Sequence, residues 1–445
     1  MNSDATTTSI RPVKTAQRTA PLFAKQPPPG LRKPSPRDAS IDVVRSICLL
    51  VVVALHALMV GVSVGPHGPV LENALDGEAW FASVTWFAQI MPLFFIAGGF
   101  SSISQWRAMS ARGDTPGDYI RARLVRLLVP SVVLVGLVGA GLVLMTLAGV
   151  PADIVSTAGY RISQPLWFLA VYLGSSALVP LLAHAHHIAR VRTIVGLLLA
   201  IAAVDALRIV TGQTAFGYAN LIFVWLFIQQ LGFWLADGSI GRMSQAARKW
   251  TAVSTLAVLM ALTISGLYSG DMYINLNPPT GALALLAVAQ LMIFSLGQPH
   301  IRRWAETPSV TYLVRVVGSR AMTIYLWHMP VLVALAGLLL ISPLPLPVPG
   351  GAEWWMTRPY WLLACLCVLV PIVRVFGRFE HVRNPPSLFP ATSRWAAFST
   401  LLGVAGVIVL LIDGITPGTA AISVLLFSCA LIGHADLPGL TTLRK

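Results

Sequence analysis

Apolar runs of about twenty residues recur along most of this chain, and they constrain its fold more than any other feature. A run of that length crosses a membrane when it forms an α-helix. Only 11% of the residues are charged, against about 25% in a soluble domain, which excludes a water-soluble enzyme. The sequence therefore predicts an all-α, polytopic membrane helical bundle. The twelve predicted spans are 41–62, 79–102, 125–148, 164–183, 193–209, 217–236, 250–268, 280–298, 319–341, 359–376, 395–412 and 417–434.

The distribution of positive charge predicts how the chain is oriented. All but three of the 31 lysines and arginines lie in segments that this order of spans places on one side. The exceptions are Arg161, Arg208 and Arg358. Since cationic loops stay in the cytoplasm, both termini are predicted to be cytoplasmic, with the chain in the inner (plasma) membrane. The net charge of +14 then reflects membrane orientation, and no nucleic-acid partner is expected.

The chain divides into three predicted parts. Residues 1–40 are rich in Ser, Thr, Pro and basic residues and lack an apolar period, so we expect a disordered basic cytoplasmic tail. Residues 41–376 form the transmembrane core. Residues 377–445 form a C-terminal helical hairpin and a short tail. Ten spans followed by a re-entrant hairpin are the alternative, because Asp413 and Pro417 interrupt the last apolar segment.

No residue pattern indicates a metal site. His184, His186 and His187 lie together, but without a nearby cysteine or carboxylate, so a solvated cytoplasmic loop is expected. All the cysteines lie in apolar runs, where packing is their usual role. The cysteines are Cys48, Cys365, Cys367 and Cys429.

The first apolar run carries two ionisable side chains beyond its charged entrance. Ionisable groups in a membrane helix are costly and mark functional sites. Arg45 and His56 are eleven residues apart, which places them on one helix face about 16 Å from each other along the axis. The spacing predicts a cation at the membrane surface with an imidazole below it. Asp42, one turn before Arg45, is expected to pair with it.

Further polar signals follow. Gly98 and Gly99 permit close helix approach or local unwinding. Arg123 and Arg126 form one cationic face at a helix start, which either anchors the chain at the inner surface or clamps a phosphate. His328 is a second deep histidine. It either bonds a neighbouring helix or shares a cavity with the first.

Five motifs carry a family resemblance. They are Asp42-x-x-Arg45 with His56, Pro92-Leu93-Phe94-Phe95-x-x-Gly98-Gly99-Phe100, Arg123-x-x-Arg126, Leu166-Trp167-Phe168-Leu169 and Tyr325-Leu326-Trp327-His328-x-Pro330. In this order, between residues 40 and 375, they resemble the acyltransferase-3 family of integral membrane O-acyltransferases. The resemblance implies a ten-helix acyltransferase-like core, to which the last two spans are an addition. It also implies transfer of an acyl group, often acetyl, from cytoplasmic acyl-CoA to a hydroxyl of a sugar, glycolipid or antibiotic, often in the cell envelope.

Two motifs depart from the family pattern. Gly98-Gly99-Phe100 stands where the family often has Ser-Gly-Phe. The segment from Leu166 to Tyr172 lacks the acidic Ser-Val-Glu motif of many members, so it offers no catalytic carboxylate.

The chemistry of acyl transfer fits the remaining residues. A buried neutral imidazole is suited to take the hydroxyl proton, so His56 is the predicted general base, with His328 as a second catalytic residue. Arg45, Arg123 and Arg126 are predicted to hold the CoA phosphates. Tyr325, Trp327 and His328 are candidates to stabilise the oxyanion. We expect acyl-CoA as a donor substrate and no permanently bound cofactor.

The expected partners are acyl-CoA, a sugar or glycolipid acceptor and the lipid bilayer, while the oligomeric state is left open. A membrane transporter or flippase of a lipid-linked sugar is the alternative function, because twelve spans suit that class as well. A transporter would work without acyl-CoA. The predicted acceptor pocket faces outside, near Glu72, Asp76, Glu78, Arg161, Arg208, Trp354, Trp355 and Arg358.

Overall fold

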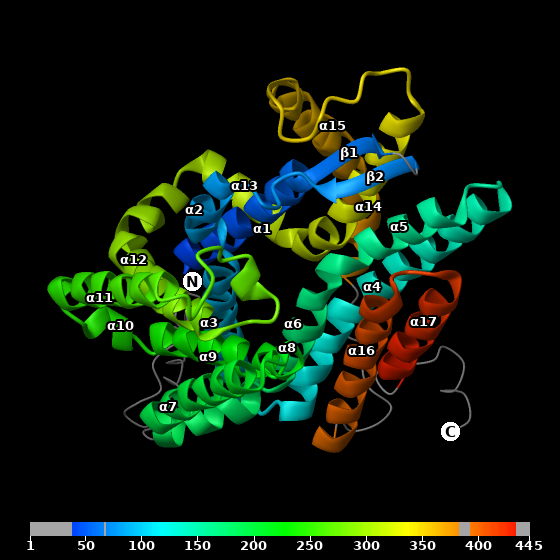
Figure 1. The fold of residues 1–445 in the computed structure, drawn as a ribbon. Coiled ribbons are helices and arrows are strands. Elements are labelled where there is room, and N and C mark those ends of the chain that lie inside the picture. The colour runs from blue at the N-terminus through cyan, green and yellow to red at the C-terminus, as the bar shows by residue number, and fades with distance from the viewer. Residues whose placement is uncertain (1–37, 66–67, 382–391, 433–445) are drawn as a thin grey trace, which may run out of the picture. The chain divides into compact units, whose positions relative to one another are not determined.

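The computed structural model describes residues 38–65, 68–381 and 392–432, most of which lie in helices (Figure 1). This confirms the predicted all-α membrane bundle, to which a single described β-hairpin is added. The elements are α1 (Ala39–Met59), β1 (Val60–Gly65), β2 (Gly68–Asn73), α2 (Ala79–Ala88), α3 (Met91–Ser110), α4 (Pro116–Leu147), α5 (Ala152–Ser163), α6 (Trp167–Ala177), α7 (Val179–Thr211), α8 (Thr214–Gly217), α9 (Asn220–Ala236), α10 (Ser239–Arg242), α11 (Gln245–Ile264), α12 (Gly281–Ala305), α13 (Pro308–Ser319), α14 (Ala321–Ile341), α15 (Ala352–Phe376), α16 (Ser393–Asp413) and α17 (Pro417–Ile432).

Within the described residues, nine helical segments are long and apolar enough to cross a membrane, fewer than the predicted twelve. They are α1, α2 with α3, α4, α7, α8 with α9, α12, α14, α15 and α16. The predicted span 164–183 is divided between the short α6 and the start of α7, because Pro165 and Pro180 favour new helix starts. The apolar helix α17 has only 16 residues, and α11 is not among the nine.

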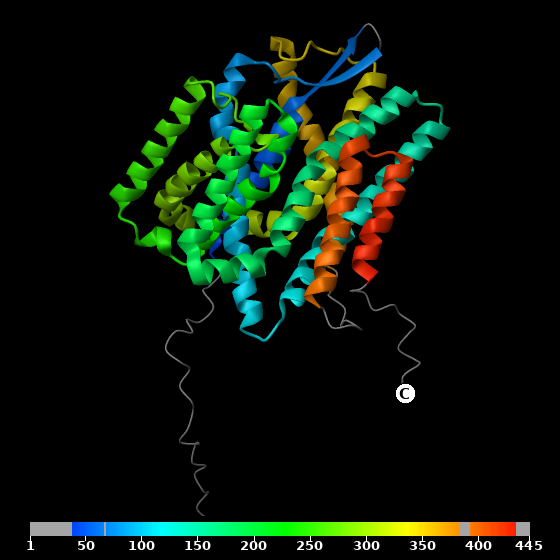
Figure 2. The ribbon, with the colours of Figure 1, turned by 60° about the horizontal axis from the view of Figure 1, so that its bottom comes forward.

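The chain turns from helix to strand directly after the first span. The prediction extended that span to residue 62, but α1 ends at Met59 and β1 begins at Val60. Valines alternate with Gly and Ser in β1, a pattern that favours an extended strand over a helix. β1 pairs antiparallel with β2, from Val60 opposite Asn73 to Gly65 opposite Gly68. Figure 2 shows this hairpin at one end of the bundle, which we call the hairpin side. The end where α1 begins is the arginine side.

Glycines set the close packing of α3 against α9. A Cβ at Gly99 would lie 2.4 Å from the carbonyl oxygen of Gln229, and one at Gly232 would lie 2.2 Å from that of Ile96. Only glycine allows this approach of two backbones. By contrast, a Cβ at Gly98 would meet only the ring of Tyr172, at an ordinary 3.6 Å. The two adjacent glycines therefore face different neighbours.

The C-terminal helices α16 and α17 pack against each other and against α4 (Figure 2). α16 also packs against α6. Small residues bring these helices together, since Ser423 donates a hydrogen bond to the Gly406 carbonyl at 2.8 Å and Gly139 lies against Ala420. The pair thus supports two helices that carry residues of the site described next.

Candidate active site

The two deep histidines, which come from opposite ends of the chain, meet in the structure. His56 on α1 and His328 on α14 place Nδ1 and Nε2 2.8 Å apart. The ring centroids are 5.0 Å apart and the planes differ by only 11°. Because the nitrogens are much closer than the ring centres, the rings meet edge to edge in a hydrogen bond rather than face to face. The packing of α1 against α14 brings together residues 272 positions apart.

Hydrogen bonding fixes where the protons lie in this pair. His328 Nδ1 lies 2.5 Å from the Tyr325 carbonyl oxygen, which only accepts, so Nδ1 carries the hydrogen. In a neutral ring, His328 Nε2 is then an acceptor, and it takes the hydrogen from His56 Nδ1. His56 Nε2 is left with a free lone pair. The arrangement therefore prepares His56, and not His328, to take a proton.

Exposure separates the two rings in the same way. His328 is fully buried, at 0% exposure, whereas His56 is partly exposed. A group that reacts with a substrate must be reachable, and its orienting partner need not be. One predicted oxyanion candidate already uses its donor, because the Tyr325 hydroxyl donates to the Pro165 carbonyl at 2.8 Å. Trp327, another candidate, is partly exposed and stacks on Phe376 at 4.4 Å.

The three predicted phosphate-binding arginines converge on one tyrosine. Arg45, Arg123 and Arg126 all lie close enough to Tyr172 for their charges to act on its hydroxyl. Arg123 is 7% exposed and bonds only neutral groups, with Nε 3.3 Å from the Tyr119 hydroxyl and Nη2 3.4 Å from the Ser102 hydroxyl. Arg45 is partly exposed and Arg126 is exposed, and the charge of Glu380 acts on Arg126. A buried guanidinium group held by hydroxyls, like that of Arg123, suits an anionic ligand. We call this set the arginine cluster.

The arginine cluster keeps hydrogen-bonding capacity unused. Arg45 Nε is buried and has no hydrogen-bond partner among the described residues. The pairing of Asp42 with Arg45 remains a prediction. Asp38 closes the helix entrance, accepting from Ser40 N at 3.0 Å and pairing with Arg302 at 2.5 Å. Burial raises the pKa of Asp38, but the bonds from Arg302 and Ser40 lower it overall.

A family model described as an acyltransferase domain matches residues 38–375. The chain belongs to the acyltransferase-3 family. Neither a curated protein nor a solved structure matches it. Both histidines, the arginine cluster and the paired glycines lie within the matched residues, whereas α16 and α17 lie outside them. The protein is therefore a multi-pass membrane acyltransferase.

Sequence reasoning missed Tyr172 in this acyltransferase. The residue lies in the segment that lacks the acidic family motif, and nothing near it in the sequence is charged. Its position at the arginine cluster comes from the packing of α4 against α6. No pattern of spacing predicts which two helices of a bundle pack together, so only the structure shows this contact.

Arg358, which was predicted to lie near the acceptor pocket, is instead buried in contacts within the protein. Arg358 is 7% exposed and donates to the Val60 carbonyl at 3.2 Å, with its guanidinium 4.2 Å above the Trp354 ring. Trp354 itself is 1% exposed, so neither side chain lines an open pocket. Trp361 Nε1 donates to the Ala57 carbonyl at 3.0 Å. Together these side chains bond carbonyls at the end of α1 and the start of β1, directly after His56.

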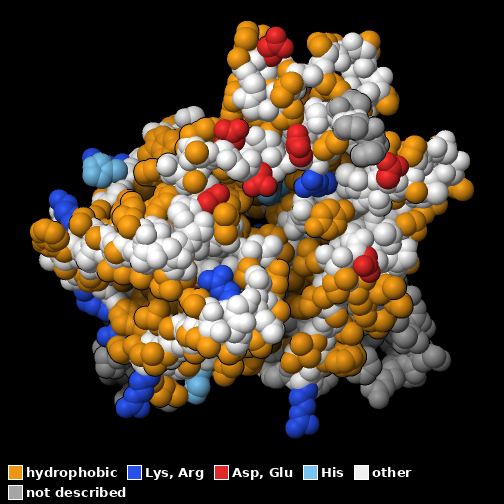
Figure 3. All heavy atoms as spheres, viewed as in Figure 1, with side chains coloured by type: hydrophobic (Ala, Val, Ile, Leu, Met, Phe, Trp, Pro, Cys, Tyr) orange, Lys and Arg blue, Asp and Glu red, His pale blue; other side chains and the backbone are white. Residues whose placement is uncertain are grey.

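The hairpin side of the acyltransferase carries the opposite charge. Figure 3 shows a hollow on this face with acidic side chains gathered around it. The Arg161 guanidinium is held by the Leu71 carbonyl at 2.5 Å, which ties α5 to β2. Arg161 is therefore used for an internal contact. The acidic residues in the loops and element ends of this side include Glu72, Asp76, Glu78, Asp271 and Glu353.

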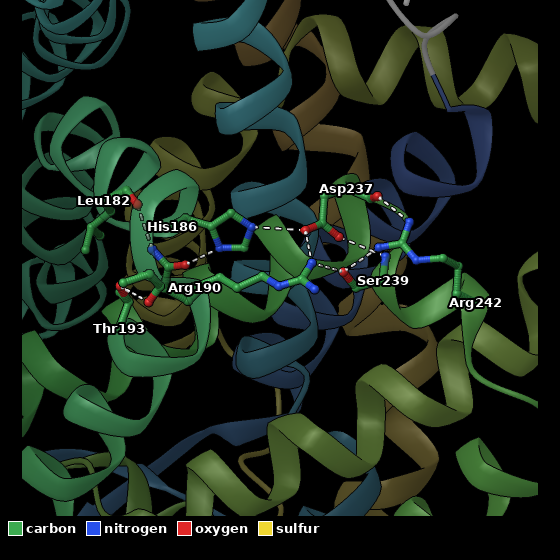
Figure 4. A network of polar contacts seen from close by, with 9 residues as sticks. Leu182, His186, Arg190, Thr193, Asp237, Ser239 and Arg242 are labelled. Carbon is green, nitrogen blue, oxygen red and sulfur yellow. Dashed lines mark hydrogen bonds and ion pairs between the residues drawn. The ribbon is translucent and has the colours of Figure 1, made fainter. Parts of the chain in front are cut away.

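The prediction that His184, His186 and His187 lie in a solvated loop is wrong. Residues 184–187 lie in α7, and His186 is only 5% exposed. His186 lies between Gln230 Oε1 at 3.0 Å and Asp237 Oδ2 at 3.1 Å, and Figure 4 shows its ring beside Asp237. These two contacts hold the buried ring in place. Burial raises the pKa of Asp237, but hydrogen bonds from His186 and Ser239 lower it to about 2. Asp237, 51 residues from His186 in the chain, was not predicted as its partner.

Proposed function

We propose that this protein is an O-acyltransferase that moves an acyl group, expected to be acetyl, from cytoplasmic acyl-CoA to a hydroxyl of a sugar, glycolipid or other envelope molecule. The observation that carries the proposal is the His56–His328 pair, in which the reachable ring has a free lone pair. Family membership supports acyl transfer in general. It also favours this function over a transporter or flippase, which would work without acyl-CoA.

The proposed reaction follows from the proton positions. The acceptor hydroxyl gives its proton to His56 Nε2 while its oxygen attacks the thioester carbonyl carbon. The carbon–sulfur bond breaks, and the acyl group stays on the acceptor oxygen. The departing thiolate takes the proton from His56, which restores the starting pair. His328 holds the His56 ring through Nδ1 and is a positioning residue in this scheme.

The charge distribution supports opposite entry of the two substrates. CoA is polyanionic, and the arginine cluster offers three guanidinium groups on the arginine side. The separation between Arg45 and His56 is about 16 Å, which is similar to the length of an extended pantetheine arm. The acceptor then approaches from the acidic hairpin side, where the hollow lies (Figure 3).

Binding and turnover of acetyl-CoA by the purified protein in lipid nanodiscs test this proposal. The protein binds labelled acetyl-CoA and slowly releases CoA, with water in place of the acceptor. Arg123→Ala loses about a hundredfold in affinity, as expected for losing charge-assisted hydrogen bonds. His56→Ala keeps the affinity but loses CoA release by a factor of about 10² to 10⁴, as expected for a general base.

Two exposed residues serve as matched controls. His187→Ala and Arg192→Ala remove the same groups from α7, away from the histidine pair. Both variants keep wild-type affinity and release. If the folded wild-type protein does not bind acetyl-CoA, the proposed function is wrong.

A further inference from the structure

One aromatic ring lies between the arginine cluster and the histidine pair. Phe168 on α6 has its ring centroid 5.4 Å from that of Tyr172 and 5.1 Å from that of Tyr325. Tyr172 belongs to the arginine cluster, and the Tyr325 carbonyl bonds His328. Phe168 therefore contacts one ring beside the arginine cluster and one ring beside the histidine pair. Its position was not predicted from the sequence.

Rings from other helices complete the surroundings of Phe168. Phe94 and Phe95 on α3 lie 5.4 and 5.5 Å from it, both edge to face. Rings from α3, α6 and α14 thus surround this side chain. Yet Phe168, Phe94 and Tyr172 are all partly exposed. The protein therefore does not cover these rings completely, and they keep surface that a ligand can contact.

The positions of these groups along the helix axes are consistent with a continuous path from the arginine cluster to the histidine pair. Tyr172 and Phe168 are four residues apart, about one turn or 6 Å along α6. Tyr325 and His328 are three residues apart on α14. These groups therefore follow one another along the bundle and cover much of the roughly 16 Å between Arg45 and His56. Their order is the arginine cluster, Tyr172, Phe168, Tyr325 and His328.

We infer that Phe168 is a binding residue for the neutral arm of the acyl donor, holding the pantetheine chain between phosphates at the arginine cluster and the thioester at His56. This inference rests on the proposed function and extends it to a residue that contributes no charge. Aromatic faces pack well against uncharged methylene and amide groups, whereas they offer nothing to a phosphate. Phe168 thus selects the arm and not the nucleotide.

A truncated donor separates these two contributions. The acetyl thioester of N-acetylcysteamine keeps the thioester end of the arm and lacks the phosphates. Phe168→Ala raises KM about tenfold for both acetyl-CoA and the truncated thioester, as expected for losing one aromatic contact. Arg123→Ala raises KM for acetyl-CoA alone. Phe168→Leu, which keeps an apolar side chain without a ring, tests the same point where the alanine variant does not fold.

A matched phenylalanine and a stability measurement control the experiment. Phe398 on α16 is 48% exposed, and Phe398→Ala leaves both KM values unchanged. Unchanged KM values in the folded Phe168 variants, or a lower unfolding temperature without a kinetic change, overturn the inference. So does a rise in KM for acetyl-CoA alone. A wild-type protein that turns over neither thioester contradicts the proposed function itself, which is a different result.

Discussion

Arginine is used in two contrasting ways in the buried parts of this protein. Arg358 bonds backbone carbonyls and lies over the Trp354 ring, so its hydrogen-bonding groups are satisfied by the fold. In the arginine cluster, Arg123 reaches only two hydroxyls, and Arg45 Nε has no partner among the described residues. The difference teaches that unused donors, and not burial alone, distinguish a binding arginine from a structural one.

The largest expected effect is the loss of stability when Arg358 is removed. Arg358→Met leaves the Val60 carbonyl without its partner and removes the contact with Trp354, at a cost of about 3 kcal/mol. Denaturant titration in mixed micelles measures the free energy of unfolding. Acetyl-CoA affinity stays at the wild-type value in the protein that remains folded. Lost affinity with unchanged stability would place Arg358 in the binding machinery and break the comparison.

A third arginine, Arg190, does face a carboxylate. Its Nη1 lies 3.6 Å from Asp237 Oδ2, so it extends the comparison of binding and structural arginines. The folded pKa of Asp237 is about 2, below its ordinary value of 3.8, so its contribution is present above pH 4 and is lost as pH falls toward 2. That contribution is about 2 kcal/mol. Unfolding measured at pH 5 and pH 2.5 gives the loss in wild type. Asp237→Asn cannot ionise at this position, so its free energy of unfolding falls less than that of wild type between pH 5 and pH 2.5. An equal fall in the variant would show that the lost stability does not come from Asp237.

The smallest expected effect has the opposite sign. Arg123→Met removes one of three like charges and replaces it with an apolar side chain of similar size, which stabilises the fold by about 1 kcal/mol. The midpoint of thermal unfolding therefore rises while acetyl-CoA affinity falls. A stability loss as large as that of Arg358→Met would show that both arginines are structural.

The sequence predicted the features that depend on one helix at a time. The apolar runs predicted the membrane helices, and the eleven-residue spacing placed Arg45 and His56 on one face of α1. The meeting of His56 with His328 followed from the cost of ionisable groups in a membrane, which makes isolated ones rare. These inferences needed only helix geometry and solvation.

Features set by packing between helices could not be predicted in this way. Tyr172 joins the arginine cluster, and His186 meets Asp237, only because particular helices are neighbours. The hairpin after α1 has strands of six residues, and β1 continues the apolar run of α1, so it was read as part of the first span. Arg358 was placed in an open pocket because sequence position does not show which carbonyls a side chain reaches.

The pairing of α1 with α14 has a consequence for the time before the chain is complete. His56 and His328 are 272 residues apart, and synthesis at roughly 5 to 20 residues per second separates them by about 15 to 50 seconds. During that interval the first imidazole is in the membrane without the ring that fixes its tautomer. If the protein acts as proposed, a nascent chain that has not yet reached α14 lacks its positioning ring, so a chain truncated before α14 is expected to hydrolyse thioesters more slowly than the complete protein.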